Sequence, residues 1–275
     1  MRIAYPACPL CEAESLPLGA ADCTRYPNWH EPLPTSLEWM RCGQCGHVHT
    51  RHYWSEAGLE EVFRYAHATQ LAGMTENPDA KRAIWLPVVQ KVLALLRPHG
   101  QSYQAFLAAG APLWVDVGCG DGALTMTAAD FGFDTVGLDA RAETVACLRQ
   151  LGFDARHGDF AKVEFDRQPD VLSMMDVLEH MPYPREALHK AATVLRPGGL
   201  IVISLPDLSC SSWRLMDAAQ RNPYWMEIEH HHNFSRGRLL ALLAECGFEV
   251  VDFAIPLRYK AQMEVYARLR GAAVA

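Results

Sequence analysis

The sequence contains no apolar run long enough to span a bilayer, and its first residues, MRIAYPACPLC, lack the apolar core of a signal peptide. It also lacks a run of Lys and Arg, and its formal net charge is −7. This charge excludes a general electrostatic attraction to nucleic acid or to anionic lipid. Together these absences predict a cytoplasmic protein that binds neither a membrane nor nucleic acid.

Half of the 275 residues are hydrophobic and 21% are charged, a balance that supports a sizeable core. The composition changes twice along the chain. Residues 1–54 are rich in Cys, Pro, Trp and His, residues 55–110 have helical periodicity, and strands alternate with helices over 111–275. We therefore expect a small N-terminal domain, a helical segment, and an α/β domain with a parallel sheet covered by helices on both faces.

Two C-x-x-C pairs, CPLC and CGQC, stand in the N-terminal domain. Their cysteines are Cys8, Cys11, Cys42 and Cys45. Four thiolates in two such pairs suit tetrahedral zinc, and a shell of four cysteines leaves no position for a catalytic water. We therefore expect structural zinc in a zinc-ribbon-like domain, with Cys23, His47 and His49 as substitute ligands. Reduced thiols or a redox pair are the alternatives.

The helical segment has recognisable start and stop signals. Asn77 suits an N-cap and Pro78 the first helical position of a helix whose apolar stripe includes Ile84 and Val88. Pro87 is expected to kink or break this helix, because proline removes a backbone donor and clashes with the preceding turn.

The stretch LWVDVGCGDGALT joins a buried strand to a helix through Gly118, Gly120 and Gly122. Glycines allow a positive φ and the close approach of a ligand to the backbone. The spacing is G-x-G-x-G, and not the G-x-G-x-x-G of dinucleotide sites. Asp116 precedes the first glycine by two residues, where an acid would repel a pyrophosphate and attract an ammonium group.

Roughly residues 111 to 268 resemble the class I methyltransferases that use S-adenosylmethionine, whose first motif is an acid followed by G-x-G-x-G. The segments TVGLDA, HGDF, PDVLSMMDVLEHMPYP and LRPGGLIVISLP resemble the later motifs in the same order. The resemblance implies that Asp139 bonds the ribose hydroxyls of the cofactor and that Asp159 and Phe160 lie at its adenine. It also places Met175 and Asp176 at the end of the fourth strand, on the cofactor side.

The resemblance further implies a doubly wound, Rossmann-like sheet of seven strands that binds the cofactor at its carboxyl edge. A final antiparallel hairpin is expected, with Pro256 in or near its connection. The segment before the sheet is expected to form a helical lid that includes Tyr65, His67 and Gln70.

The sulfonium already activates the methyl group, so the protein mainly has to align the acceptor and, for some acceptors, supply a base. His180 in DVLEHMPYP is one candidate base. The stretch EIEHHHNFS resembles a motif, HEHFSYFS, of sugar C-methyltransferases that carry an N-terminal zinc domain, and this places Glu229 and His230 as an acid–base pair.

Two alternatives for the three histidines stay open, a metal site and a plain solvated or buried cluster. In an extended strand at most two of the three side chains share a face. Whether His231 and His232 join the site is also open.

We expect a methyltransferase that acts on a small-molecule acceptor, sugar-like or another biosynthetic intermediate. DVLEHMPYP also resembles small-molecule O-methyltransferases such as quinone-biosynthesis enzymes. An RNA base methyltransferase with an N-terminal zinc site and a non-catalytic scaffold are the alternatives. The acceptor, the methylated atom and the oligomeric state are left open by the sequence.

Overall fold

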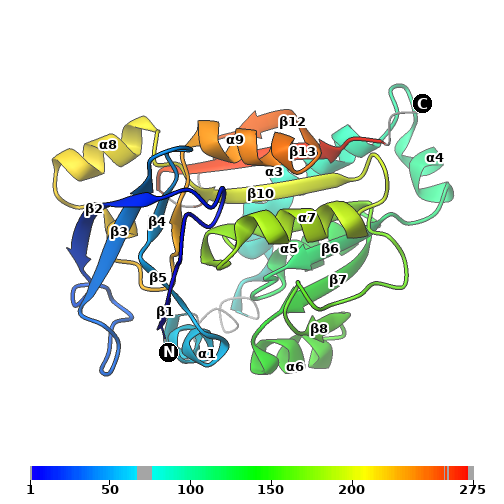
Figure 1. Ribbon diagram of the computed structural model, residues 1–275. Helices are drawn as coiled ribbons and strands as arrows, with labels where there is room; N and C mark the ends of the chain where they lie inside the picture. The colour runs from blue at the N-terminus through cyan, green and yellow to red at the C-terminus, as the bar shows by residue number, and fades with distance from the viewer. Residues whose placement is uncertain (1, 67–75, 257, 259, 272–275) are drawn as a thin grey trace.

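A computed structural model of the protein describes residues 2–66, 76–256, 258 and 260–271. Its centre is a seven-stranded sheet (Figure 1). The strands are β6 (Leu113–Val117), β7 (Asp134–Asp139), β8 (Ala155–His157), β9 (Val171–Met175), β10 (Leu200–Pro206), β12 (Phe248–Ala254) and β13 (Gln262–Leu269). The order is β12-β13-β10-β9-β6-β7-β8, and β13 runs antiparallel to both its neighbours. The predicted doubly wound sheet is confirmed, and Pro256 lies in the connection between β12 and β13 as expected.

Helices cover both faces of this sheet. The helices after residue 76 are α3 (Pro78–Leu96), α4 (Tyr103–Ala108), α5 (Ala123–Asp130), α6 (Ala142–Gln150), α7 (Pro184–Val194), α8 (Ser211–Ala218) and α9 (Arg236–Glu245), with the short 3₁₀ turns η1 (Leu178–His180) and η2 (Pro223–Trp225). Successive residues of a strand face opposite sides. Val115 accordingly packs in one core with Leu188 of α7 and Leu242 of α9. Trp114 packs in the other core with Val88 of α3 and Leu124 of α5.

Helix α3 starts as predicted but differs in its interior. The Asn77 side chain accepts a hydrogen bond from the Ala80 amide at 3.1 Å, which confirms the N-cap. The break expected at Pro87 does not occur, because the helix continues as one element through it. Burial of the residues that follow, Val88 among them, holds the helix on the sheet despite the missing donor. Ile84 is 44% exposed and does not belong to the buried stripe.

The expected helical lid is only partly covered by the described residues. Helix α1 (Glu56–Ala66) lies beside β5 (His52–Trp54) (Figure 1). His67 and Gln70 lie outside the described residues, as does the side chain of Tyr65. The lid and the division at residues 54 and 110 stay predictions, although α3 packs as a layer of the sheet domain.

The N-terminal segment forms a second sheet that it shares with the later chain. Strands β2 (Ser15–Asp22), β3 (Ser36–Cys42), β4 (Val48–Thr50) and β11 (His232–Asn233) pair in the order β11-β4-β3-β2. A short ladder joins β1 (Arg2–Ala4) to β5. Strand β11 begins at the last histidine of the run, His232, which pairs with His49 across the sheet. The N-terminal strands therefore lie against the sheet domain through direct backbone pairing.

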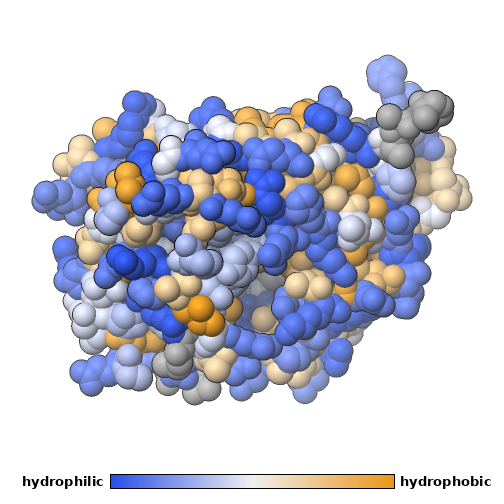
Figure 2. Space-filling view, viewed as in Figure 1, coloured by the Kyte–Doolittle hydropathy of each residue, from blue (hydrophilic) through white to orange (hydrophobic). Residues whose placement is uncertain are grey.

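The face of the molecule in Figure 2 carries hydrophilic residues over most of its area, with hydrophobic residues scattered among them. Within the described part of the chain, no helix has the length and apolar character needed to cross a membrane.

Candidate functional site

The glycine-rich turn follows β6 at the carboxyl edge of the sheet. Gly118, Gly120 and Gly122 have φ angles of 69°, 55° and 76°, a region that side chains with a Cβ rarely adopt. A Cβ on Gly118 would lie 2.5 Å from a methyl group of Val177, and one on Gly122 would lie 2.6 Å from a methyl group of Leu148. The turn therefore needs glycine both for its backbone conformation and for space.

Two carboxylates flank this turn. Asp116 is buried in β6 and accepts hydrogen bonds from the hydroxyls of Ser173 at 2.6 Å and Thr125 at 3.3 Å. Burial raises the pKa of Asp116 to about 7, although these hydrogen bonds act in the opposite direction. Asp139 ends β7 and accepts from the Gly120 amide at 3.0 Å, so it ties the turn to the neighbouring strand.

The other predicted cofactor residues lie along the same edge. Phe160 is buried, whereas Asp159 is exposed and accepts from the Ala161 amide at 2.9 Å. Met175 ends β9 and packs in the core on the α3 side. Asp176 follows with a φ of 58°, and burial raises its pKa to about 6. The structure thus brings all the predicted cofactor residues to the carboxyl ends of neighbouring strands.

The predicted catalytic residues meet beyond the end of β9. Val177 touches Gly118 of the turn, and it directly precedes the 3₁₀ turn η1 that carries Glu179 and His180. The rings of His180 and His230 lie edge to face, with centroids 4.7 Å apart. We call Glu179, His180, Glu227, Glu229 and His230 the carboxylate–histidine cluster.

Hydrogen bonds orient both histidines of the cluster. The Nδ1–H of His180 donates to the Glu229 carbonyl at 3.0 Å. The Nε2 of His230 lies 2.9 Å from a carboxylate oxygen of Glu227. In the neutral form of each ring, these contacts put the proton on Nδ1 of His180 and on Nε2 of His230.

The cluster is buried and rich in carboxylates, which shifts its pKa values. Burial raises the pKa of Glu179 to about 8. Burial lowers the pKa of His230, but the carboxylates of Glu227, Glu179 and Glu229 outweigh it and raise the pKa to about 9. These carboxylates therefore favour the protonated form of His230 in this arrangement.

The remaining histidines of the run point away from the cluster. Nε2 of His232 donates to the Met181 carbonyl at 2.9 Å, and its Nδ1 accepts from Nε2 of His47 at 3.0 Å. The His231 side chain is buried, and its Nε2 has no hydrogen-bond partner among the described residues. Of the three, His230 lies against His180, whereas His232 turns to His47. Strand alternation alone would put these two side chains on one face, but β11 begins only at His232 and His230 precedes it.

Residues 102–252, more than half of the chain, match the protein family described as "Methyltransferase domain". The chain belongs to this family. Its sheet and glycine turn are those of the class I methyltransferases that depend on S-adenosylmethionine.

Two curated proteins illustrate what the chain is similar to. A ubiquinone biosynthesis O-methyltransferase of Erwinia tasmaniensis is 32% identical over 111 residues, which are 36% of this chain and 44% of that protein. A probable S-adenosylmethionine-dependent methyltransferase of Mycolicibacterium smegmatis is 32% identical over 162 residues, 57% of this chain and 60% of that protein. The chain thus spans less than two thirds of each.

Two solved structures share the fold. The crystal structure of TnmH has a TM-score of 0.53 at 18% identity and covers 77% of this chain and 61% of that chain. A complex of the Haloferax volcanii Trm112 methyltransferase activator with a putative methyltransferase gives a TM-score of 0.54 at 15% identity, over 74% of this chain and 97% of that chain.

The N-terminal domain supplies residues that sequence reasoning missed. The Tyr26 hydroxyl donates to the Glu229 carboxylate. The indole N–H groups of Trp39 and Trp54 donate to the carbonyls of Trp225 at 2.9 Å and Ile228 at 2.8 Å, and so hold the segment that carries Glu229. The tryptophan content of residues 1–54 is the only signal in the sequence that points to such anchors.

The four predicted zinc ligands converge. Their Sγ atoms all lie within 4.8 Å of one another, and the Cys8–Cys45 and Cys11–Cys42 pairs are 3.7 Å and 3.5 Å apart. Tetrahedral zinc with Zn–S bonds of about 2.3 Å places its sulfurs about 3.8 Å apart. The residues therefore fit a zinc ion without rearrangement.

The two C-x-x-C turns have the same backbone geometry. The amide of Cys8 donates to Ala13, and that of Cys42 donates to His47, both at 2.9 Å. The residues after the second cysteine of each pair, Glu12 and Gly46, have φ angles of 60° and 71°. A non-glycine residue in this region needs a structural reason, and two matched turns facing one centre provide it.

The substitute zinc ligands are engaged elsewhere. His47 bonds to His232, and His49 bonds to the Thr50 carbonyl and the Ser15 hydroxyl. Cys23 packs in a separate apolar core of the N-terminal domain.

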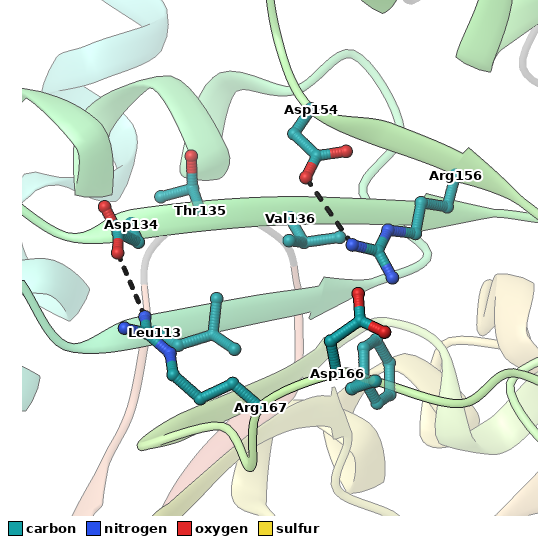
Figure 3. A pocket seen from close by; sticks show the side chains of 9 residues that line it. Leu113, Asp134, Thr135, Val136, Asp154, Arg156, Asp166 and Arg167 are labelled. Carbon is teal, nitrogen blue, oxygen red and sulfur yellow. Dashed lines mark hydrogen bonds and ion pairs between the residues drawn. The ribbon is translucent and has the colours of Figure 1, made fainter.

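A surface hollow of about 350 Å³ opens at the opposite edge of the sheet from the glycine turn. Its lining includes the first residues of β6 and β7, Leu113 and Asp134. Figure 3 shows four of its charged side chains in two pairs, Asp134 with Arg167 at 3.0 Å and Asp154 with Arg156 at 3.7 Å. The pairing and the location set this hollow apart from the cofactor edge.

Proposed function

We propose that this protein transfers the methyl group of S-adenosylmethionine to a small-molecule acceptor. The observation that carries the proposal is the glycine turn at the end of β6, flanked by Asp116 and Asp139, in a chain of the methyltransferase-domain family. The cofactor supplies an activated methyl group, and the protein supplies alignment and a site from which water is excluded.

The residues of the carboxyl edge suit the parts of this cofactor. The ionised Asp116 would attract the ammonium group of the methionine moiety, and Asp139 would accept from both ribose hydroxyls. Asp139 bonds to the Arg141 guanidinium at 2.9 Å, so that guanidinium would move as the ribose enters. Phe160 and Asp159 would contact the adenine.

The remaining cofactor residues, Met175 and Asp176, stand where β9 ends, between the cofactor edge and the carboxylate–histidine cluster. They would line the passage between sulfonium and acceptor.

On the acceptor side of the site, the residues proposed to act in catalysis are His180, Glu229 and His230. The acceptor loses a proton to the site, its electron pair forms a bond to the methyl carbon, and the carbon–sulfur bond breaks to release S-adenosylhomocysteine. His180 is placed to accept that proton, whereas His230 and Glu229 orient the acceptor. Burial of these groups under the N-terminal domain favours a small acceptor over a polymer, and the net charge of −7 argues against RNA.

The proposal includes a structural zinc ion held by Cys8, Cys11, Cys42 and Cys45. The ion would stabilise a domain too small for a large core of its own. Because this domain also holds the segment around Glu229, its folding would support the acceptor side of the site.

Calorimetry with S-adenosylhomocysteine tests the cofactor site. Wild-type protein should bind, and Asp139→Asn should weaken binding at least tenfold. Asp134→Asn is the matched control, because Asp134 lies at the opposite end of the same strand. Absence of binding to wild type would favour the non-catalytic scaffold.

Methyl transfer from labelled S-adenosylmethionine to a panel of catechols, sugar nucleotides and ribosomal RNA then tests the acceptor class. His180→Gln should lose turnover on the accepted compound while it keeps cofactor affinity. Transfer only to RNA would overturn the small-molecule proposal.

A further inference from the structure

Three side chains of the carboxylate–histidine cluster bring potential metal ligands together. Glu179 and His180 come from η1, and His230 comes from the segment before β11. One donor atom from each lies within 4.8 Å of the other two. A cation with N and O ligands at about 2.0 to 2.2 Å keeps its donors about 3 to 4 Å apart, so this spacing fits a single ion.

The hydrogen bonds of the two histidines match those of metal ligands. A ligating histidine usually donates its other ring N–H to a carbonyl or carboxylate, which orients the ring and selects the tautomer. His180 donates to the Glu229 carbonyl at 3.0 Å, and His230 contacts the Glu227 carboxylate at 2.9 Å. Nδ1 of His230 has no hydrogen-bond partner among the described residues.

The third residue, Glu179, is a buried carboxyl group with an unused ligand atom. Its side chain is 1% exposed, and its Oε2 has no hydrogen-bond partner within the described part of the chain. A buried carboxyl oxygen that lacks a hydrogen bond is costly. A divalent cation would remove that cost.

Aromatic rings shield the group from water. The Tyr224 ring stacks on His230 with centroids 6.0 Å apart, and the Phe63 ring meets His180 edge-on at 5.8 Å. Burial strengthens the attraction between a cation and its ligands.

We infer that Glu179, His180 and His230 hold a divalent cation of the first transition row, such as Mn²⁺ or Fe²⁺. Two histidines and one carboxylate form a ligand set typical of these ions, and they leave coordination positions open for other ligands. Glu227 would act as a positioning residue through His230.

The use of the ion rests on the proposed function. Val177, next to this group in the chain, touches Gly118, so the group stands beside the cofactor turn. An acceptor with one or two hydroxyl oxygens would fill those positions, and the cation would lower the pKa of a bound hydroxyl. The hydroxyl proton leaves to solvent water, the oxygen bonds to the methyl carbon, and S-adenosylhomocysteine departs. The bound ion would thus take over the activation of the acceptor that the proposed function gives to His180, while His180 and His230 would hold the ion.

The test measures how many metal ions the wild type and each variant bind per chain. Elemental analysis of the purified protein gives the metal that it carries, and loss of the free Mn²⁺ electron paramagnetic resonance signal counts the Mn²⁺ added by titration. The summed metal should be one equivalent per chain higher in wild type than in Glu179→Gln or His230→Gln. Glu227→Gln should bind Mn²⁺ about 10 to 100-fold more weakly. Glu186→Gln and His189→Gln, on the exposed face of α7, are the matched controls and should equal wild type.

Thermal melting and S-adenosylhomocysteine binding establish that each variant is folded. Equal summed metal in wild type and in Glu179→Gln would overturn the metal inference and leave the proposed function standing. A full equivalent of Mn²⁺ with no binding of S-adenosylhomocysteine would support the metal site and overturn the proposed function.

Discussion

The Tyr26 hydroxyl donates a hydrogen bond to the carboxylate of Glu229, a residue 203 positions later in the chain. Asn28 in turn donates to the Tyr26 oxygen at 3.1 Å, which orients the hydroxyl. The N-terminal domain therefore contributes to the site, because it holds the carboxylate proposed to face the acceptor. Four predictions concern this contact, the cofactor turn, the carboxyl group beside it and the zinc site.

Replacement of Tyr26 by Phe should destabilise the protein. One carboxylate oxygen of Glu229 already lacks a hydrogen-bond partner among the described residues. The change removes the hydrogen-bond partner of the other oxygen. A buried group left unsatisfied costs about 1 to 3 kcal/mol in the free energy of unfolding. Urea denaturation measures that loss. Tyr103→Phe is the control, because the Tyr103 hydroxyl bonds to the Phe131 carbonyl at an exposed position where water can replace it. Equal losses in both variants would contradict a special role for Tyr26.

Replacement of Gly118 by Ala should weaken cofactor binding. The new Cβ would meet Val177 at 2.5 Å in a residue with a φ of 69°, and would push the turn away from η1. We expect at least a tenfold loss of affinity for S-adenosylhomocysteine, measured by calorimetry, and a loss of about 1 to 3 kcal/mol in stability. Gly100→Ala separates the two causes, because Gly100 has a φ of 79° but open space around it. If Gly118→Ala bound the cofactor like wild type, the assigned role of the turn would be wrong.

Cofactor affinity should rise with pH through the pKa of Asp116, which lies at about 7. The ammonium group attracts the ionised carboxylate, and the ionised fraction rises about tenfold between about pH 6 and pH 8. Calorimetry at several pH values should show this gain in wild type and a flat profile in Asp116→Asn. For folding without ligand the sign is reversed. A raised pKa in the folded state contributes stability below about pH 4 that is lost as the pH rises through about 7. A pH-independent affinity in wild type would remove Asp116 from the ammonium site.

Loss of the zinc site should disturb the acceptor side and spare the cofactor side. In Cys45→Ser one thiolate is missing, and elemental analysis should show less zinc than in wild type. Limited proteolysis should then cut residues 1–54 faster, because the sheet that pairs β4 with β11 loosens. Turnover should fall with little change in cofactor affinity. Cys147→Ser on α6 is the control, as Cys147 belongs to no ligand group among the described residues. Normal zinc content in Cys45→Ser would refute the four-cysteine site.

Much of the cofactor edge was predictable because its signals are local. The spacing of Gly118, Gly120 and Gly122 reflects backbone angles and contacts within a single turn. The strands are recognisable in the sequence as short apolar runs, because both faces of the sheet are covered. The same holds for the N-cap at Asn77, where donor and acceptor lie three residues apart.

Two departures from expectation in the interior of α3, the missing break at Pro87 and the exposure of Ile84, had a tertiary cause. Pro87 weakens a helix when considered by itself, yet the buried residues after it bind the helix to the sheet. At Ile84 the sequence pattern suggested burial, but the apolar side chain is exposed in the folded protein.

By itself the sequence determined the α/β sheet, the glycine turn with its acids, and the two cysteine pairs. Each of these is set by residues a few positions apart or by the period of burial in a single element. Only the tertiary structure decided that His230 faces His180 and Glu179 while His232 turns to His47, and that Tyr26 reaches Glu229. Such contacts join segments far apart in the chain, and they depend on how two sheets pair at β4 and β11. No local pattern of residues encodes that pairing.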